Sequence, residues 1–287
     1  MNKKTLSDIL EWIENNITSN VTIEHLTNMS GYSRRFIHNL FKKYLDVSPG
    51  QYIRQRKLCM AANLLKLTSQ TANKIALDLG FSSEQSFSRE FKKNFGVPPK
   101  QYRTRGYWNT SQLLPPLKAI DRFNGFISHG EVISMPDITL EGFELIYTEP
   151  LPYKACNRQG LRKSSILKHI NEKQQSIYVA SEFNPTYNNS NFVKISTFTG
   201  IKHMKHHENK NICKKKINGG EFVKFMFCGD WDAYRRLPDY IYRLKLKEGN
   251  LVRRDGPDIE LFKFNKKEVV CEDYVECSYY VPIISSN

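Results

Sequence analysis

The stretch that decides the fold of the first third of the chain is residues 75–99, IALDLGFSSEQSFSREFKKNFGVPP. A short helical segment ends at Gly80, and the serines that follow stand where a helix N-cap belongs. The next helix carries an apolar stripe at helical spacing, which indicates a buried face: Phe87, Phe91 and Phe95. A helix, a glycine-containing turn and a second helix make a helix-turn-helix pattern.

The same pattern occurs once before, about 50 residues earlier in the chain. GYS at 31–33 recurs as GFS at 80–82, and FKK at 41–43 recurs as FKK at 91–93. The first copy has its own apolar stripe, which we expect to be buried: Ile37, Leu40, Phe41 and Tyr44. The repeat predicts an all-α N-terminal domain with two helix-turn-helix units.

Each copy also carries a polar, basic stripe on the opposite side of its second helix. The two stripes are Arg35, His38, Asn39 and Lys42 in the first copy, and Gln85, Ser88, Arg89 and Lys92 in the second. A DNA-recognition helix needs this division, because one face packs on the domain while the other reaches base edges.

A long helix from Ser48 to about Leu67 is expected to join the two units. Ser48 is the predicted N-cap, Pro49 the first helical residue, and Gln51 completes a capping box. A helix of ~18 residues spans ~27 Å. That length suits two recognition helices set about one DNA turn, ~34 Å, apart.

The charge of the chain lies mainly on this region. The whole chain has a formal net charge of +14, from 43 Lys+Arg against 29 Asp+Glu. Residues 1–106 hold 17 of the basic and 8 of the acidic residues, so most of the excess lies there. A localised basic excess favours a polyanionic partner, and on paired recognition helices it favours duplex DNA over a membrane.

Other features predict an ordinary protein of the cytoplasm, associated with the nucleoid. The sequence has no run of ~18 apolar residues and no signal-peptide pattern at its start. Its six cysteines form no Cys-x-x-Cys motif, so we expect free thiols. We expect no cofactor and no metal, because the histidines at 203–207 are flanked by lysines and suit a solvated loop.

The remainder of the chain has a different composition. We place a linker at residues 106–120, where Pro115 and Pro116 interrupt helical structure. Residues 121–287 are rich in aromatic residues and contain predicted strands at 221–228 and 278–284 and a helix at 233–246. The predicted fold of this second domain is α+β.

The quoted motifs resemble the DNA-binding domain of the AraC/XylS family over residues 1–105. Two stretches of the second domain, GGEFVKFMF at 219–227 and NLVRRDGPDIE at 250–260, resemble GyrI-like effector-binding domains. An N-terminal DNA-binding domain followed by a GyrI-like domain is similar to the Rob-like subgroup, which is related to MarA and SoxS.

This resemblance implies a monomer that binds two adjacent major grooves of double-stranded DNA, with RNA polymerase as a protein partner. The implied base-contacting residues are Ser33, Arg35, His38, Asn39, Gln85, Ser86, Ser88 and Arg89. The implied phosphate-contacting residues are Arg34, Lys42, Lys43, Arg54, Lys92 and Lys93. Phosphate contacts position a protein on DNA, whereas base contacts specify the sequence that it reads.

The first recognition helix departs from its relatives in the MarA and Rob group. Those proteins have Trp, Gln and Arg where this chain has Arg35, His38 and Asn39, and Gln where it has Glu84. Arginine can contact guanine with two hydrogen bonds, and asparagine can do so with adenine. We therefore expect a related but different DNA site.

The second domain is expected to hold a small-molecule effector. The candidate carboxylate is Glu260, which among aromatic walls would favour an organic cation; the candidate walls are Tyr147, Phe225 and Trp231. The alternative is that Glu260 is an exposed strand carboxylate and that the aromatic residues are plain core.

The sequence thus predicts a DNA-binding transcriptional regulator, an activator of stress or drug-tolerance genes, and not an enzyme. Two alternatives stay open. In one, the second domain hydrolyses a small reactive ester or thioester and the DNA-binding domain is regulatory. In the other, the protein is a nucleoid-like binder with little preference for sequence.

Overall fold

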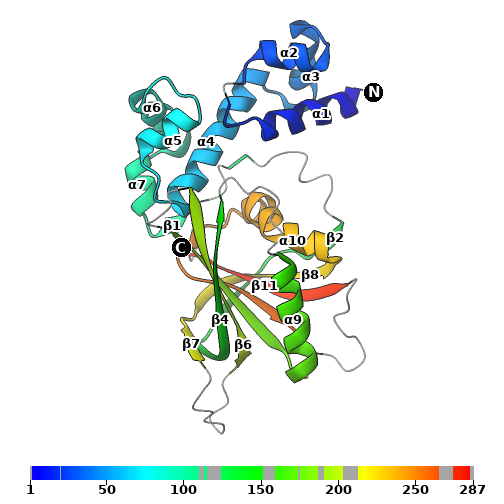
Figure 1. Ribbon diagram of the computed structural model, residues 1–287, viewed down its shortest axis with the longest axis vertical. Helices are drawn as coiled ribbons and strands as arrows, with labels where there is room; N and C mark the ends of the chain where they lie inside the picture. The colour runs from blue at the N-terminus through cyan, green and yellow to red at the C-terminus, as the bar shows by residue number, and fades with distance from the viewer. Residues whose placement is uncertain are drawn as a thin grey trace. The chain divides into compact units, whose positions relative to one another are not determined.

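A computed structural model describes residues 2–19, 21–109, 113–114, 124–150, 159–173, 175–186, 191–202, 213–264 and 274–284. The chain divides into two compact units. The first comprises residues 1–105 and 112–122, and the second comprises residues 106–111 and 123–287. The described part of the first unit is helical and that of the second is built on a sheet (Figure 1), as predicted.

Seven α-helices occupy the described part of the first unit. They are α1 (Asn2–Asn15), α2 (Ile23–Ser30), α3 (Arg34–Leu45), α4 (Pro49–Leu67), α5 (Ala72–Asp78), α6 (Glu84–Phe95) and α7 (Pro99–Thr104). Short turns join α2 to α3 and α5 to α6. Both turns contain a glycine in the left-handed region, Gly31 and Gly80, each with φ of 72°. A side chain at either position would be strained, which explains the repeated glycine.

The predicted caps and most of the predicted buried stripes are confirmed. The Ser33 hydroxyl accepts from the Phe36 amide at 3.3 Å, and the Ser83 hydroxyl accepts from the Ser86 amide at 3.1 Å. Every stripe residue on α3 and α6 is buried except one. Tyr44 was expected to be buried but is 38% exposed, and the last turn of α3 packs against the core through Leu45 instead.

Helix α4 has the predicted capping box, with Ser48 and Gln51 exchanging backbone and side-chain hydrogen bonds of 2.9 and 3.2 Å. One basic residue on it is structural rather than a surface charge. Arg56 is 6% exposed and donates to both carboxylate oxygens of Glu14, at 2.6 and 2.7 Å. A bidentate pair of this kind fixes geometry as well as charge, so it ties α4 to α1.

The second unit contains a nine-stranded antiparallel sheet with strand order β2-β8-β11-β10-β5-β6-β4-β7, and β3 also pairs with β8. Its strands are β2 (Gly125–Ile127), β3 (Glu131–Met135), β4 (Ile138–Pro150), β5 (Ile177–Pro185), β6 (Phe192–Lys202), β7 (Cys213–Ile217), β8 (Gly220–Gly229), β10 (Asp258–Phe262) and β11 (Val275–Pro282). At one end, β7 carries three consecutive lysines, 214–216, which pair with the carboxylates of Glu141, Glu144, Glu182 and Asp137.

Two helices cover one face of this sheet (Figure 1). These are α9 (Gln159–Lys173) and α10 (Trp231–Tyr240), and α10 continues as a π-helical turn (Ile241–Lys245) and α11 (Leu246–Glu248). The predicted helix at 233–246 is therefore confirmed, and Pro238 lies inside it. The π turn begins at Ile241, after Asp239 and Tyr240 have continued the α-helix beyond the proline.

The segment predicted as a linker contains ordered structure that belongs to the second unit. Strand β1 (Tyr107–Trp108) pairs with β9 (Arg253–Arg254) in a separate two-stranded sheet. The other predicted features of this segment, including Pro115 and Pro116, lie outside the described residues, as do the histidines at 203–207. The domain boundaries at 105 and 120 stay a prediction.

Candidate functional site

The candidate base-contacting residues of the first repeat lie on one side of α3. Arg35, His38 and Asn39 are exposed, while Ile37 and Leu40 face the core. Ser33 is also exposed, but its hydroxyl already serves as the N-cap of α3. The structure therefore presents three free polar side chains, rather than four, at the start of this helix.

The second repeat has the same arrangement on α6. Gln85 and Arg89 are exposed, and Ser86 and Ser88 are half-buried. The opposite face consists of Phe87, Phe91 and Phe95, which are almost completely buried. Among the candidate base-contacting residues of α6, the exposed ones are thus one amide and one guanidinium, the side-chain types that read adenine and guanine.

All six candidate phosphate-contacting residues are exposed, and three of them have acidic partners. Arg34 pairs with Glu24, Lys42 with Asp46 at 2.6 Å, and Arg54 with Glu90 at 3.2 Å. The others are Lys43, Lys92 and Lys93. Exposed ion pairs contribute only about 0–1 kcal/mol to stability, so a phosphate can replace these partners at little cost.

The candidate effector carboxylate is enclosed in the second unit. Glu260 lies on β10 and is 3% exposed, so the alternative of an exposed strand carboxylate is wrong. Its Oε2 accepts from Tyr234 Oη at 2.6 Å and from Arg162 Nη2 at 2.5 Å. The strand register places Glu260 opposite Tyr279 of β11 and Val179 of β5, in the centre of the sheet.

The three candidate aromatic walls occupy different positions around this carboxylate. Tyr147 is half-buried on β4, near enough for Arg162 and Glu260 to act on its hydroxyl electrostatically. Trp231 meets the Tyr234 ring edge-on at 5.3 Å. Phe225 is 1% exposed and is a core residue, one strand further away on β8.

Arg162 supplies the counter-charge of Glu260 in this largely apolar setting. Burial acts to lower the pKa of Arg162, but the Glu260 carboxylate and the surrounding tyrosines together raise that pKa well above its ordinary value. The pKa of Tyr234 is also raised, by burial first, so its hydroxyl stays a donor. The guanidinium lies 5.7 Å from the centre of the Tyr234 ring. An internal cation therefore already occupies the place expected for an organic cation.

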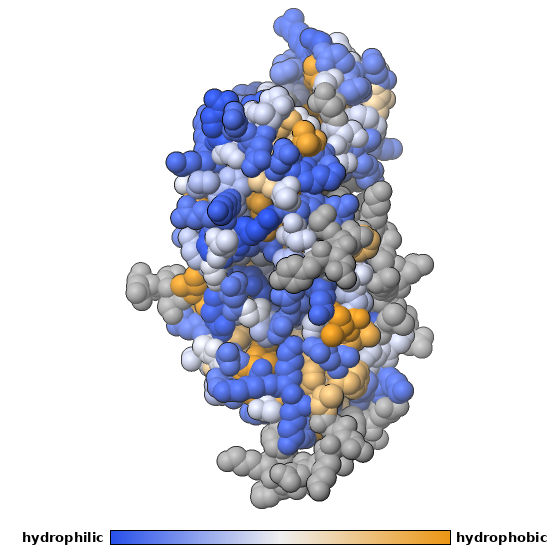
Figure 2. Space-filling model, turned by 60° about the vertical axis from the view of Figure 1, so that its left-hand side comes forward, coloured by the Kyte–Doolittle hydropathy of each residue, from blue (hydrophilic) through white to orange (hydrophobic). Residues whose placement is uncertain are grey.

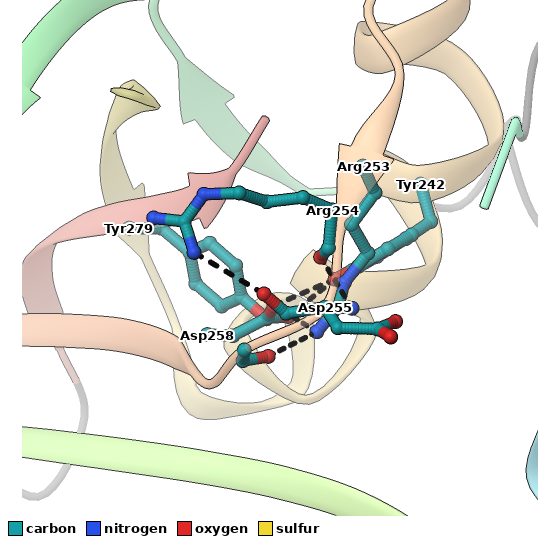
Figure 3. A network of polar contacts seen from close by, with 7 residues as sticks. Tyr242, Arg253, Arg254, Asp255, Asp258 and Tyr279 are labelled. Carbon is teal, nitrogen blue, oxygen red and sulfur yellow. Dashed lines mark hydrogen bonds and ion pairs between the residues drawn. The ribbon is translucent and has the colours of Figure 1, made fainter. Parts of the chain in front are cut away.

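A second buried carboxylate lies two residues away on the same strand (Figure 3). Asp258 is 1% exposed and accepts from Tyr279 Oη at 2.7 Å and Tyr242 Oη at 2.7 Å. Arg253 completes the network at 3.2 Å from Asp258 Oδ1 and also donates to Tyr242 Oη at 2.7 Å. Arg253 lies on β9, Tyr242 on the π turn, Asp258 on β10 and Tyr279 on β11, so this network joins four elements of the second unit.

Arg162 and the Asp258 network were not among the residues predicted from the sequence. Arg162 lies on α9, a helix that was not predicted, although Ile166 and Ile170 have the i, i+4 spacing of its buried side. Tyr234 was expected only as part of an apolar stripe. A tyrosine whose hydroxyl must find a partner in the core is the signal that pointed to a buried acceptor.

Two family models match the chain. One, described as a helix-turn-helix domain, covers residues 26–105, and the other, described as a GyrI-like small molecule binding domain, covers residues 154–284. The putative HTH-type transcriptional regulator YkgA of Escherichia coli is 36% identical over 199 residues, which are 69% of this chain and 82% of YkgA.

Two further relatives match different extents of the chain. The transcriptional regulator Rob of Salmonella typhimurium is 25% identical over 285 residues, 97% of either chain. The multiple antibiotic resistance protein MarA of Escherichia coli is 40% identical over 113 residues, 39% of this chain and 89% of MarA. Together with the fold, these matches define a DNA-binding transcriptional regulator with a GyrI-like domain. The chain belongs to the AraC/XylS family and is Rob-like in its domain order.

No helix in the described part of the chain combines the length and the apolar character needed to cross a membrane. The visible surface in Figure 2 is largely hydrophilic, with apolar side chains in small groups. Scattered apolar groups of this kind are ordinary for a protein surface.

Proposed function

We propose that α2–α3 and α5–α6 are two helix-turn-helix units, joined by α4, which bind two adjacent major grooves of double-stranded DNA as a monomer. The observation that carries this proposal is the repeated pair of helices with matching glycine turns, serine caps and opposed apolar and basic faces. Helix α4 has 19 residues and so spans ~28 Å, which is close to one turn of DNA.

In this proposal α3 and α6 are the recognition helices. Arg35, His38 and Asn39 read one half-site, and Gln85, Ser86, Ser88 and Arg89 read the other, with Ser33 at the edge of the first. The phosphate-binding residues in this proposal are Arg34, Lys42, Lys43, Arg54, Lys92 and Lys93. On binding DNA, Arg34, Lys42 and Arg54 exchange their surface carboxylate partners for phosphates.

Selection of bound sequences from randomised duplexes tests this reading. We expect two half-sites about one turn apart. Arg35→Ala should relax the base preference of the first half-site only, and Arg89→Ala that of the second half-site only. Arg235→Ala, on exposed α10 of the second unit, is the matched control. Binding without sequence preference would instead support the nucleoid-like alternative.

The direction of regulation and the targets follow from the relatives. We propose an activator of stress or drug-tolerance genes that acts with RNA polymerase in the cytoplasm, at the nucleoid. The printed name of MarA, a multiple antibiotic resistance protein, supports the class of target. Transcription from a promoter carrying the selected site, with purified polymerase, should rise when the protein is added.

For the second unit we propose a binding site for an aromatic organic cation around Glu260. Tyr147, Trp231 and Tyr234 stand near the carboxylate, while Phe225 supports them from the core. Because Arg162 already neutralises Glu260, such a ligand must displace this guanidinium. The Nε of Arg162 is buried without a hydrogen-bond partner among the described residues. At least one donor of this side chain is therefore unpaired.

Displacement gives a specific test with tetraphenylphosphonium as the probe. Arg162→Gln frees the carboxylate and should bind the cation more tightly than the wild-type protein, whereas Glu260→Gln should bind it least. Titration calorimetry measures both. Equal binding by all three proteins would show that the cation binds elsewhere.

We propose that the second unit is not an enzyme. Glu260 is bonded to an arginine and a tyrosine, and it is enclosed, so it is poorly placed to act as a general base. Turnover of an activated thioester that is lost in Glu260→Gln would favour the hydrolase alternative.

A further inference from the structure

A cleft of about 440 Å³ opens in the first unit between its two helix pairs. Its walls come from the start of α2, from His38 of α3, from the first two turns of α4, and from Gly80 and Phe81 before α6. Every wall is therefore part of, or adjacent to, an element that the proposed function places on DNA.

Lys57 of α4 lines this cleft and is 8% exposed. Nothing described in the structure gives its ammonium a hydrogen bond or an ion pair. Burial, and then the charge of Arg54, lower the pKa of Lys57. The stem of Lys57 is buried, whereas its ammonium lies at the cleft without a counter-charge among the described residues. An anion bound in the cleft would supply that counter-charge.

The acidic residues around the cleft are already paired with other cations. Glu24, on the α2 wall, binds Arg34. Glu90 of α6 binds Arg54, which also lines the cleft, at 3.2 Å. His38 adds a donor on the α3 wall, and the N-terminus of the 19-residue helix α4, at Ser48 and Gly50, adds the positive end of a helix dipole. The surroundings of Lys57 thus favour an anion.

We propose that the cleft receives a phosphate group of the DNA backbone, on the strand that crosses between the two major grooves, and that Lys57 is its principal counter-charge. The inference rests on the proposed function, because α3 and α6 must lie on the same duplex. It adds a phosphate contact that neither the sequence pattern nor the exposed lysines indicate, at the centre of the bound site rather than at its flanks.

The test is the salt dependence of DNA binding by the full chain. Each phosphate contact contributes about 0.9 to the slope of log affinity against log salt. Lys57→Met keeps an unbranched side chain and removes the charge, so its slope should be shallower by about 0.9. Between 50 and 200 mM salt, the loss of DNA affinity should therefore be about 3.5-fold smaller in this variant than in the wild-type protein. Lys247→Met, an exposed lysine of the second unit, should keep the wild-type slope.

Lys57→Arg keeps the charge and should keep the slope, which separates loss of charge from loss of folding. A wild-type slope in Lys57→Met, measured while the wild-type protein binds its selected site, overturns the inference and leaves the proposed function standing. A wild-type protein that selects no site overturns the proposed function itself.

Inorganic phosphate distinguishes a free anion from the DNA backbone. At matched ionic strength without DNA, we expect phosphate to stabilise wild-type protein and Lys57→Met equally against heat. If phosphate stabilised only the wild-type protein and Lys57→Met kept the DNA slope, the cleft would be a site for a free anion, and the backbone assignment would be wrong.

Discussion

Arg162 and Glu260, 98 positions apart in the sequence, form a 2.5 Å ion pair beneath the helices of the second unit. The carboxylate is 3% exposed and the arginine side chain 20% exposed, so both charges are largely withdrawn from water. The pair joins α9 to the central strand β10. We infer two roles for it. The pair holds the helix on the sheet, and Arg162 neutralises the carboxylate until a ligand cation displaces it.

The two members of this pair should be strongly coupled. Loss of one partner from a buried pair costs about 3–5 kcal/mol, because the other charge is left without compensation. We expect this loss in Glu260→Gln, and a smaller loss in the double variant with Arg162→Gln. Urea unfolding of the three proteins measures the coupling. Arg236→Gln, which breaks an exposed pair with Asp232, should cost at most about 1 kcal/mol.

The Asp258 network gives a second prediction about stability. Tyr279→Phe removes a 2.7 Å hydrogen bond from a carboxylate that is 1% exposed, while the ring can stay in place. An unmade hydrogen bond to a buried group costs about 1–3 kcal/mol. Tyr280, its neighbour on the other face of the sheet, makes no such bond to Asp258, so Tyr280→Phe is the control. Similar midpoints of thermal unfolding for the two variants would contradict the assignment.

DNA recognition should divide between bases and phosphates. Arg89→Ala is expected to cost about 1–3 kcal/mol on the selected site and to relax one base position, because a bidentate contact with guanine discriminates by that amount. Lys92→Ala should weaken binding to every duplex alike and make the salt slope shallower by about 0.9. Fluorescence anisotropy with the selected and a scrambled duplex separates the two effects. Equal losses on both duplexes in Arg89→Ala would assign that residue to phosphate.

Lys57 should also affect the free energy of unfolding in the absence of DNA. Its pKa is lowered in the folded protein, so below that lowered value the protonated lysine destabilises the fold. The penalty is relieved as the pH rises through the folded-state pKa toward the value of an unfolded lysine. Lys57→Met should therefore unfold at a higher urea concentration than the wild-type protein at pH 7.

That advantage should shrink at alkaline pH. Unfolding of both proteins between pH 7 and 10.5 measures the difference, with Lys247→Met as the control for loss of one positive charge. A stability difference that does not change with pH would mean that Lys57 does not titrate differently in the folded protein.

The helical unit could be predicted closely because its pattern is local. The caps at Ser33, Ser48 and Ser83, the turn glycines and the apolar stripes are each set by neighbours within about five residues. The prediction for Tyr44 was wrong because its neighbour Leu45 packs against the core instead, and helical spacing alone does not decide between two apolar residues at the end of a stripe.

The second unit was predictable only in outline, since its site is made of distant segments. Alternation identified β8 and β11, yet the partner of Glu260 comes from a helix about 100 residues earlier. Glu260 is buried, and its role in effector binding stays a prediction. Its internal cation could not be inferred without the sheet order β10-β5-β6-β4 beneath α9. Lys57 was counted only as positive charge, because burial of an α4 lysine depends on both helix pairs.

The lysines of β7 account for part of the positive charge that the second unit retains. Among the described strands β7 ends the sheet, and an exposed edge offers unpaired backbone groups to any other extended chain. Lysine side chains at 214–216 make that edge unfavourable for a further strand while their carboxylate partners keep them ordered. We therefore expect the charged side chains at this edge to disfavour pairing with a second chain, whereas the basic residues of the first unit serve the proposed binding of DNA.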